Sequence, residues 1–135
     1  MLHLEFTVLG PPVSYQTKDK ANLKVWKQTI RDEAGKKWTT IPLTTKLKMT
    51  LINFHERDDA PMDDDNMVKP IRDAMNKLVY EDDRQITYSV LIQISIDAPI
   101  KVRKGPRILL DACWNGEEFL YIRIEDAPDF IQLPQ

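Results

Sequence analysis

The spacing of apolar residues changes several times along this chain, and these changes constrain its fold more than any other feature. In some segments every second residue is apolar, which is typical of a strand with one buried face. In others the step is three or four residues, which is typical of an amphipathic helix. The predicted strands are Leu4–Gly10, Thr45–Phe54, Ile86–Ile96 and Phe119–Ile124, and the predicted helices are Ala21–Trp38, Asp65–Val79 and Ile108–Trp114.

The resulting order, β-α-β-α-β-α-β, predicts a single compact α+β domain with a mixed sheet and helices packed on it. We expect the domain to span residues 1–126 and residues 127–135 to form a tail. The length of 135 residues fits one domain with one core. The spacing does not predict the order of the strands in the sheet. In the second strand the apolar residues change phase at Ile52, which a β-bulge would explain.

The composition indicates an ordinary soluble protein, with 42% hydrophobic and 30% charged residues. No stretch approaches the roughly eighteen apolar residues of a membrane span. The first residues, MLHLEFTVLGPP, lack the basic region and the cleavage site of a signal peptide. The single cysteine, Cys113, cannot form an internal disulfide, which suits the cytoplasm.

The net charge of −2 argues mildly against a nucleic-acid partner. The charges are unevenly distributed, however, because acidic residues concentrate between Glu56 and Asp83 and basic residues gather on either side. A metal-dependent phosphodiesterase needs such an arrangement, with carboxylates for the metal and cations for the phosphates. The alternative is that the basic residues are ordinary solvated surface. The candidate DNA-binding residues are Lys18, Lys20, Lys101, Arg103, Lys104 and Arg107.

Three adjacent aspartates, Asp63, Asp64 and Asp65, precede the second predicted helix. Their charges repel one another, so a cation or a helix N-terminus must compensate them. One aspartate can cap the helix, but a single cap does not explain three carboxylates. In an extended loop Asp63 and Asp65 point to the same side, where they could bind one hard cation together.

Lys69 follows Asp65 by one helical turn and lies opposite the apolar face of the predicted helix. It could bind a scissile phosphate, or it could form an ordinary surface pair with Asp65. A second acidic group, residues 81–83, follows the helix at an end where the dipole disfavours negative charge. Either this group is a solvated turn, or Asp83 completes the metal site that begins before the helix.

The segment from Asp63 to Ile86 resembles the RusA family of Holliday junction resolvases. The shared pattern is D-x-D-N-x-x-K-x-x-x-D-A followed by D-D-x-Q-I, which here is Asp63, Asp65-Asn66, Lys69, Asp73-Ala74, then Asp82-Asp83 and Gln85-Ile86. Two further segments are also similar to the family, namely G-x-P-V near the start (Gly10, Pro12, Val13) and Tyr121-Ile122-Arg123-Ile124 near the end.

This resemblance implies a homodimer with an α+β fold that uses Mg²⁺ to cut four-way DNA junctions in recombination and repair. It implies that Asp63, Asp65 and Asp83 are the metal-binding carboxylates and that Lys69 is the essential lysine. Two sites in the dimer would cut both strands symmetrically. Members of the family are frequent in phages and prophages. Asp73 is expected to be structural or to hold Lys69 in place.

Two features depart from the family pattern. Pro70 follows Lys69, where it removes one N–H and could kink the helix, and the net acidity is unexpected for a protein that binds junctions. Two other functions therefore stay open. One is a catalytically silent protein that binds Ca²⁺ or a protein partner, although the acidic loop lacks the glycine and the closing glutamate of an EF-hand. The other is a nuclease for flaps, replication forks or other branched DNA.

Overall fold

The computed structural model describes residues 1–56, 62–96 and 105–135 of the chain. Strands β1 to β4 span Leu2–Leu9, Leu47–His55, Ile86–Ser95 and Phe119–Asp126, and helices α1 to α3 span Lys20–Gly35, Asp64–Met75 and Arg107–Trp114. A 3₁₀ turn, η1, covers Asp83–Gln85 immediately before β3. The α+β class and the predicted order β-α-β-α-β-α-β are therefore confirmed.

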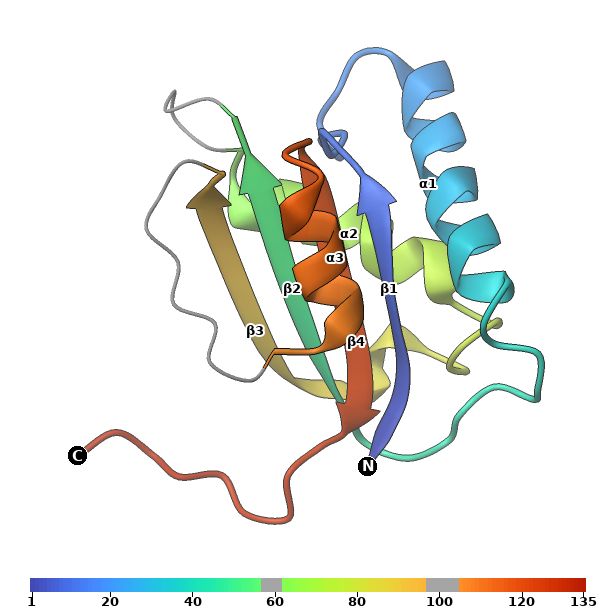
Figure 1. The fold of residues 1–135 in the computed structure, drawn as a ribbon. Helices are drawn as coiled ribbons and strands as arrows, with labels where there is room; N and C mark the ends of the chain where they lie inside the picture. The colour runs from blue at the N-terminus through green and yellow to red at the C-terminus, as the bar shows by residue number, and fades with distance from the viewer. Residues whose placement is uncertain (57–61, 97–104) are drawn as a thin grey trace.

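The four described strands form one sheet in the order β1-β4-β2-β3 (Figure 1). β4 is antiparallel to both β1 and β2, whereas β2 and β3 are parallel. Parallel neighbours need a crossover connection, and α2 lies on that connection. The carboxyl ends of β2 and β3 therefore lie at the same edge of the sheet, and the chain leaves β2 at this edge to enter α2.

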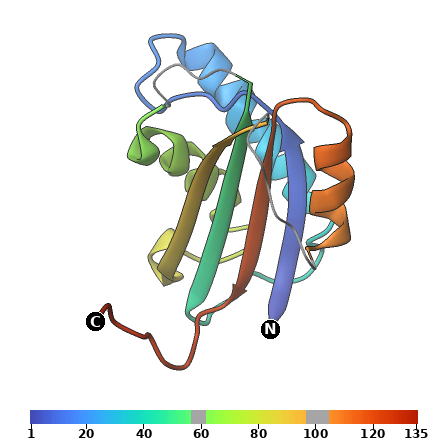
Figure 2. The same cartoon turned by 60° about the vertical axis from the view of Figure 1, so that its left-hand side comes forward.

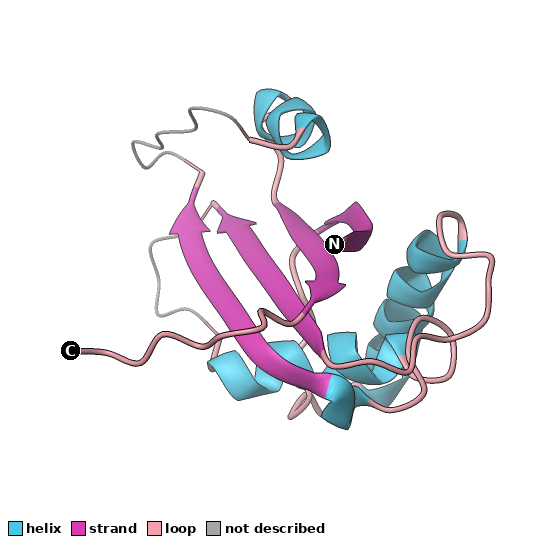
Figure 3. Cartoon of the chain, turned by 90° about the horizontal axis from the view of Figure 1, so that it is seen from below, coloured by secondary structure: helices cyan, strands magenta, loops and turns pink. Residues whose placement is uncertain are grey.

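Helices cover both faces of the sheet, α1 and α2 on one face and α3 on the other (Figures 2 and 3). The larger core lies beneath α1 and α2, where inward-facing residues of β1, β2 and β4 meet the helices. The helical residues buried there include Leu23, Trp26, Ile30, Met67 and Ile71. A smaller cluster of Phe54, Leu109, Phe119 and Tyr121 lies beneath α3. α2 is thus anchored by its apolar face, which leaves its other face available for the polar residues of a site.

A β-bulge was one explanation for the change of phase in the second strand, and β2 does contain an irregularity, but it does not lie at Ile52. The irregularity in the pairing of β2 with β3 lies between Leu47 and Lys48, at the start of the strand. Ile52 and Phe54 pack in the cluster beneath α3, where Phe54 stacks on Phe119 with 4.4 Å between ring centroids. The pattern changes because this end of β2 is covered on both faces.

Two predicted helix ends were too late. α1 ends at Gly35 rather than Trp38, and α2 ends at Met75 rather than Val79. Just after α2 the backbone of Lys77 has a φ of 65°, in the left-handed region where a chain commonly turns. Trp38 and Val79 still pack on the core beyond the two helices, which is why the helical spacing extends past each helix in the sequence.

The chain after β4, residues 127–135, forms no helix or strand and extends away from the sheet at the lower end of Figure 1. Phe130 and Leu133 in this segment are exposed. None of the helices in the described ranges has both the length and the apolarity that a membrane crossing requires.

Candidate functional site

α2 begins within the acidic segment. The Asp63 carboxylate caps the helix, because its Oδ1 accepts the backbone N–H of Asp65 at 3.0 Å. Asp64 and Asp65 occupy the first turn, where the helix dipole favours negative charge. Asp64 Oδ1 also accepts a hydrogen bond of 2.7 Å from Gln93 Nε2 on β3. The Asp65 carboxylate has no hydrogen bond or ion pair within the described residues, so it is available to a ligand.

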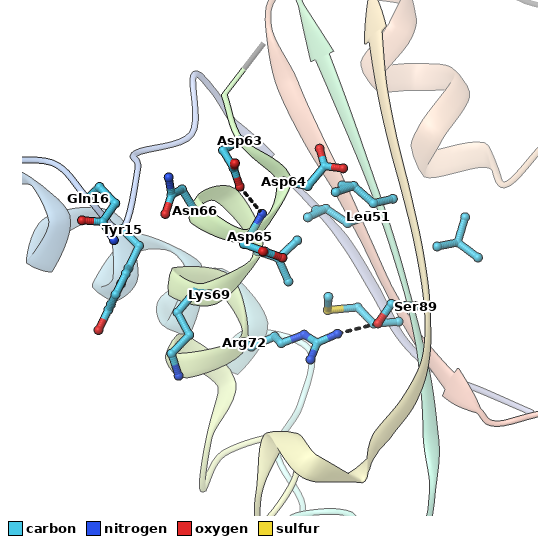
Figure 4. Close-up of a pocket in the computed structure, with 14 residues that line it drawn as sticks. Tyr15, Gln16, Leu51, Asp63, Asp64, Asp65, Asn66, Lys69, Arg72 and Ser89 are labelled. Atoms are coloured by element: carbon cyan, nitrogen blue, oxygen red, sulfur yellow. Dashed lines mark hydrogen bonds between the residues drawn. The ribbon is translucent and has the colours of Figure 1, made fainter.

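A cavity of about 740 Å³ lies beside the first turns of α2 (Figure 4). Its polar lining comes from Asp63, Asp64, Asp65, Lys69 and Arg72 of α2 and its cap, from Tyr15 and Gln16 before α1, and from Ser89 on β3. Met49, Leu51 and Leu91 contribute an apolar wall. The cavity therefore places carboxylates and cations together beside an apolar wall.

Pro70 ties this helix to the loop before α1. α2 continues through Pro70 to Met75, but proline lacks the N–H that would donate to the carbonyl of Asn66. That carbonyl instead accepts the backbone N–H of Tyr15 at 2.9 Å. The proline thus leaves an acceptor that the loop uses, and the bond brings Tyr15 and Gln16 to the cavity.

Lys69 lines the cavity one turn after Asp65, but its partner is Asp73. Its Nζ donates to Asp73 Oδ1 at 3.0 Å, which agrees with the expectation that Asp73 holds the lysine. This hydrogen bond, together with the charge of Asp73, raises the pKa of Lys69 above its ordinary value, and the charge of Asp83 acts in the same direction. The side chain is 48% exposed. Lys69 therefore presents an accessible cation at neutral pH.

The second acidic group is held by its own hydrogen bonds. Asp82 caps η1, since its Oδ1 accepts the backbone N–H of Arg84 at 2.9 Å and the Gln85 side chain accepts the N–H of Asp82 in return. The side-chain hydrogen bond from Arg84, together with the backbone one, lowers the pKa of Asp82 to about 2. Asp83 is close enough for its charge to act on Lys69, but it is not among the residues that line the cavity.

The structure thus brings Asp63, Asp65 and Lys69 to one cavity, whose lining does not include Asp83. Within residues 1–56, 62–96 and 105–135, no group of three or more His, Cys, Asp or Glu side chains is arranged to hold a metal ion. Asp63 and Asp65 nevertheless provide hard oxygen donors, which are the ligands that Mg²⁺ prefers. The pair fits part of a magnesium site.

The predicted DNA-binding residues fall in different places. Lys18 and Lys20 are exposed and follow Tyr15 and Gln16, which line the cavity. Lys20 Nζ donates to the carbonyl of Tyr15 at 3.3 Å. Arg107 begins α3 on the opposite face of the sheet (Figure 2), so the structure does not bring it to the cavity. Lys101, Arg103 and Lys104 lie outside the described residues.

Sequence reasoning missed several residues around the cavity. Gln93 Nε2 donates to Asp64 Oδ1 and to the backbone carbonyl of Met62. Ser89 accepts a hydrogen bond from Arg72. A signal for Gln93 was present, because it lies on the same face of its strand as Leu91, and a polar residue on a partly buried face needs a partner. Ser89, on the same face, is exposed. Arg72 had no comparable signal, since its neighbours come from distant segments.

A comparison with protein-family models matches residues 10–109 to the family described as Endodeoxyribonuclease RusA. The matched range is more than half of the chain and contains both acidic groups together with Lys69. No curated protein sequence matches the chain.

Proposed function

The chain belongs to the RusA family of endodeoxyribonucleases, and on this premise we propose that it resolves four-way DNA junctions in a reaction that depends on Mg²⁺. The proposed chemistry is hydrolysis of one phosphodiester bond in each of two opposed strands. One observation carries the proposal, namely that Asp63, Asp65 and Lys69 line a single cavity at the start of α2.

Asp63 and Asp65 would hold the metal. Both line the cavity, and Asp65 has no partner within the described residues that would have to be displaced. Asp63 uses Oδ1 to cap α2, which leaves Oδ2 for a second contact. A metal ion bound by these carboxylates supplies a water of lowered pKa and stabilises negative charge on the phosphate.

Asp83 is the third proposed ligand, and it requires a separate test because η1 places it near Lys69 rather than in the cavity. Its charge favours the protonated form of Lys69. The two possible roles of Asp83, metal ligand or modulator of Lys69, predict different effects on the affinity for the metal. A ligand would change the affinity for the metal, whereas a residue acting only through Lys69 would leave that affinity unchanged.

Lys69 is proposed to contact a non-bridging oxygen of the scissile phosphate and to stabilise the charge that develops there during hydrolysis. A lysine of ordinary pKa is already protonated at neutral pH, and the raised pKa of Lys69 acts in the same direction. Asp73 is a positioning residue, because its 3.0 Å contact restricts the direction of a side chain that remains half exposed. Lys27, 3.7 Å from Asp73, partly compensates the same carboxylate.

We also propose that the active form is a homodimer. Symmetric cutting of a four-way junction requires two sites, and the described part of the chain contains one cavity lined by these carboxylates. Lys18 and Lys20 are exposed in the segment that follows Tyr15 and Gln16 of the cavity lining. They are proposed to contact the DNA backbone, since lysines bind phosphates independently of sequence.

The test is cleavage of a labelled synthetic four-way junction, with a linear duplex of the same sequence as the control. The reaction is run in Mg²⁺, in EDTA and with the Asp65→Asn variant. We expect paired nicks across the junction that require both Mg²⁺ and Asp65. Equal cleavage of the linear duplex would keep the nuclease and reject junction specificity, and a panel of flaps and forks would then identify the branched substrate. No cleavage over a range of salt and metal concentrations would favour a catalytically silent binding module instead.

A further inference from the structure

Arg72 is a cation in the cavity to which the proposed reaction assigns no role. We propose that Arg72 is a second phosphate-binding residue, which contacts the backbone of the substrate strand on the β3 side of the cavity while Lys69 contacts it on the other side. This inference rests on the proposed function, since it requires a DNA strand in the cavity.

The placement of Arg72 follows from helix geometry. Asp65, Lys69 and Arg72 are separated by four and three residues, so successive turns of α2 place them along one stripe. All three line the cavity. In Figure 4 the ammonium of Lys69 and the guanidinium of Arg72 extend to opposite sides of α2, with Asp65 above and between them. A proposed metal ligand is therefore flanked by a cation on each side.

The Arg72 side chain contacts only a neutral group. Its Nη2 donates to Ser89 Oγ at 2.5 Å, and its Nε is buried without a hydrogen-bond partner. No carboxylate among the described residues forms an ion pair with it. A guanidinium carries five N–H donors, so one hydroxyl leaves most of them unused and the positive charge uncompensated.

Other arginines in the described ranges are compensated by the protein itself. Their partners are carboxylates for Arg84, Arg107 and Arg123, and backbone carbonyls at the end of α2 for Arg31. Lys69, the other cation that lines the cavity, has Asp73. A buried polar group without a partner needs an explanation, and an anionic ligand in the cavity would provide one for Arg72.

A phosphodiester suits this position better than a single-oxygen ligand. Its two non-bridging oxygens match the paired, planar donors of a guanidinium. Met49 and Leu51, which line the same cavity, are apolar and offer the guanidinium no strong hydrogen-bond acceptor in place of a phosphate. With Lys69 on the other side, the cavity can hold two phosphates of one strand around the carboxylates.

Three variants separate this role from a purely structural one, in which Arg72 would only fasten α2 to β3 through Ser89. Arg72→Gln removes the charge. Arg72→Lys retains the charge but not the planar pair of donors. Ser89→Ala removes the fastening contact and leaves the guanidinium in place. Arg72→Met, which preserves the apolar stem, replaces Arg72→Gln if thermal unfolding shows that the glutamine variant is not folded.

The measurement is the affinity for a labelled four-way junction in EDTA over a range of salt concentrations. For Arg72→Gln we expect the affinity to fall roughly tenfold and the slope of log K against log salt to become shallower by about 1. Arg72→Lys should restore the slope and part of the affinity. Ser89→Ala should leave the slope unchanged.

An unchanged slope in Arg72→Gln, or an equal loss of affinity in Ser89→Ala, would make Arg72 structural and overturn the inference. Cleavage in Mg²⁺ is followed in parallel to separate the two proposals. If the slope differs between wild type and Arg72→Gln but the wild type cuts no DNA, the phosphate contact is retained and the nuclease is rejected. If the wild type cuts junctions but has the same slope as Arg72→Gln, the nuclease is retained and the phosphate contact is rejected. Absence of any DNA binding would reject both.

Discussion

The two acidic groups, residues 63–65 and 81–83, are alike in composition but are used differently by the fold. Each begins a helical turn, and in each one aspartate caps that turn, Asp63 for α2 and Asp82 for η1. In the first group Asp65 has no partner within the described residues and faces the cavity. In the second group Asp82 is also paired with Arg84 at 3.1 Å, and Asp83 is not among the residues that line the cavity beside Asp65.

This difference shows that the number of carboxylates in a motif does not decide which of them can bind a metal. A carboxylate that already accepts hydrogen bonds from the protein must lose some of them before it can bind a metal. A carboxylate without a partner loses nothing, but it needs a compensating field, which the start of α2 provides for Asp65. The following experiments test the contrast, beginning with the largest expected effect.

Replacing Asp65 with Asn should abolish most of the cleavage of a four-way junction, by at least about a hundredfold. The reason is that the variant loses a charged oxygen donor of the proposed metal site. The melting temperature should change little, because the Asp65 carboxylate has no hydrogen bond or ion pair within the described residues and its interaction with the start of α2 is worth about 1 kcal/mol or less. The matched control is Asp64→Asn, whose amide oxygen can still accept the hydrogen bond from Gln93. Equal activity of Asp65→Asn and wild type would remove Asp65 from the site.

Replacing Asp83 with Asn should reduce cleavage by roughly tenfold to a hundredfold and should weaken metal binding. Both are measured, the second by calorimetric titration of Mg²⁺ or Mn²⁺. The control is Asp82→Asn, which should bind the metal as wild type does because Asp82 is used to cap η1. If Asp83→Asn cleaves poorly but binds metal normally, Asp83 acts through the charge of Lys69 and is not a ligand.

Replacing Pro70 with Ala should loosen the loop before α1. The new N–H can donate to the Asn66 carbonyl, which now accepts only the N–H of Tyr15 from outside the helix. We expect the Tyr15 amide to exchange its hydrogen faster, and the free energy of unfolding to change by less than about 1 kcal/mol. The amide of Leu23, which donates to Asp19 within α1, is the internal control. Unchanged protection at Tyr15 would show that the proline is not needed for this contact.

The smallest effect should come from the charge of Asp82. Its pKa in the folded protein, about 2, lies below the ordinary value of 3.8. The charge therefore stabilises the folded state above pH 3.8, and this contribution is lost as the pH falls toward 2. Asp82→Asn retains an oxygen to cap η1 but cannot titrate. Urea unfolding of both proteins from about pH 5 downward should show a small difference that disappears with acid, and parallel curves would contradict the assignment.

Much of the candidate site could be predicted because its chemistry is local. The aspartates before an apolar helical pattern predicted a cap, and Asp63 provides it. The period of that pattern predicted a buried face, and Met67 and Ile71 are fully buried. The same period placed Lys69 on the accessible side, where it lines the cavity. The family pattern predicted an endodeoxyribonuclease, and the family match over residues 10–109 confirms that class.

By itself, the sequence thus determined the element order, the start of α2 and the family. Only the tertiary structure decided the strand order, the contact of Arg72 with Ser89, and the hydrogen bond from Tyr15 to the Asn66 carbonyl. It also decided that the cavity lining includes Asp65 and not Asp83. The physical reason is the range of the interactions. Helical and capping hydrogen bonds join residues a few positions apart and leave a period in the sequence. Contacts among α2, β3 and the loop before α1 depend on how three separate surfaces pack, and no local spacing records that.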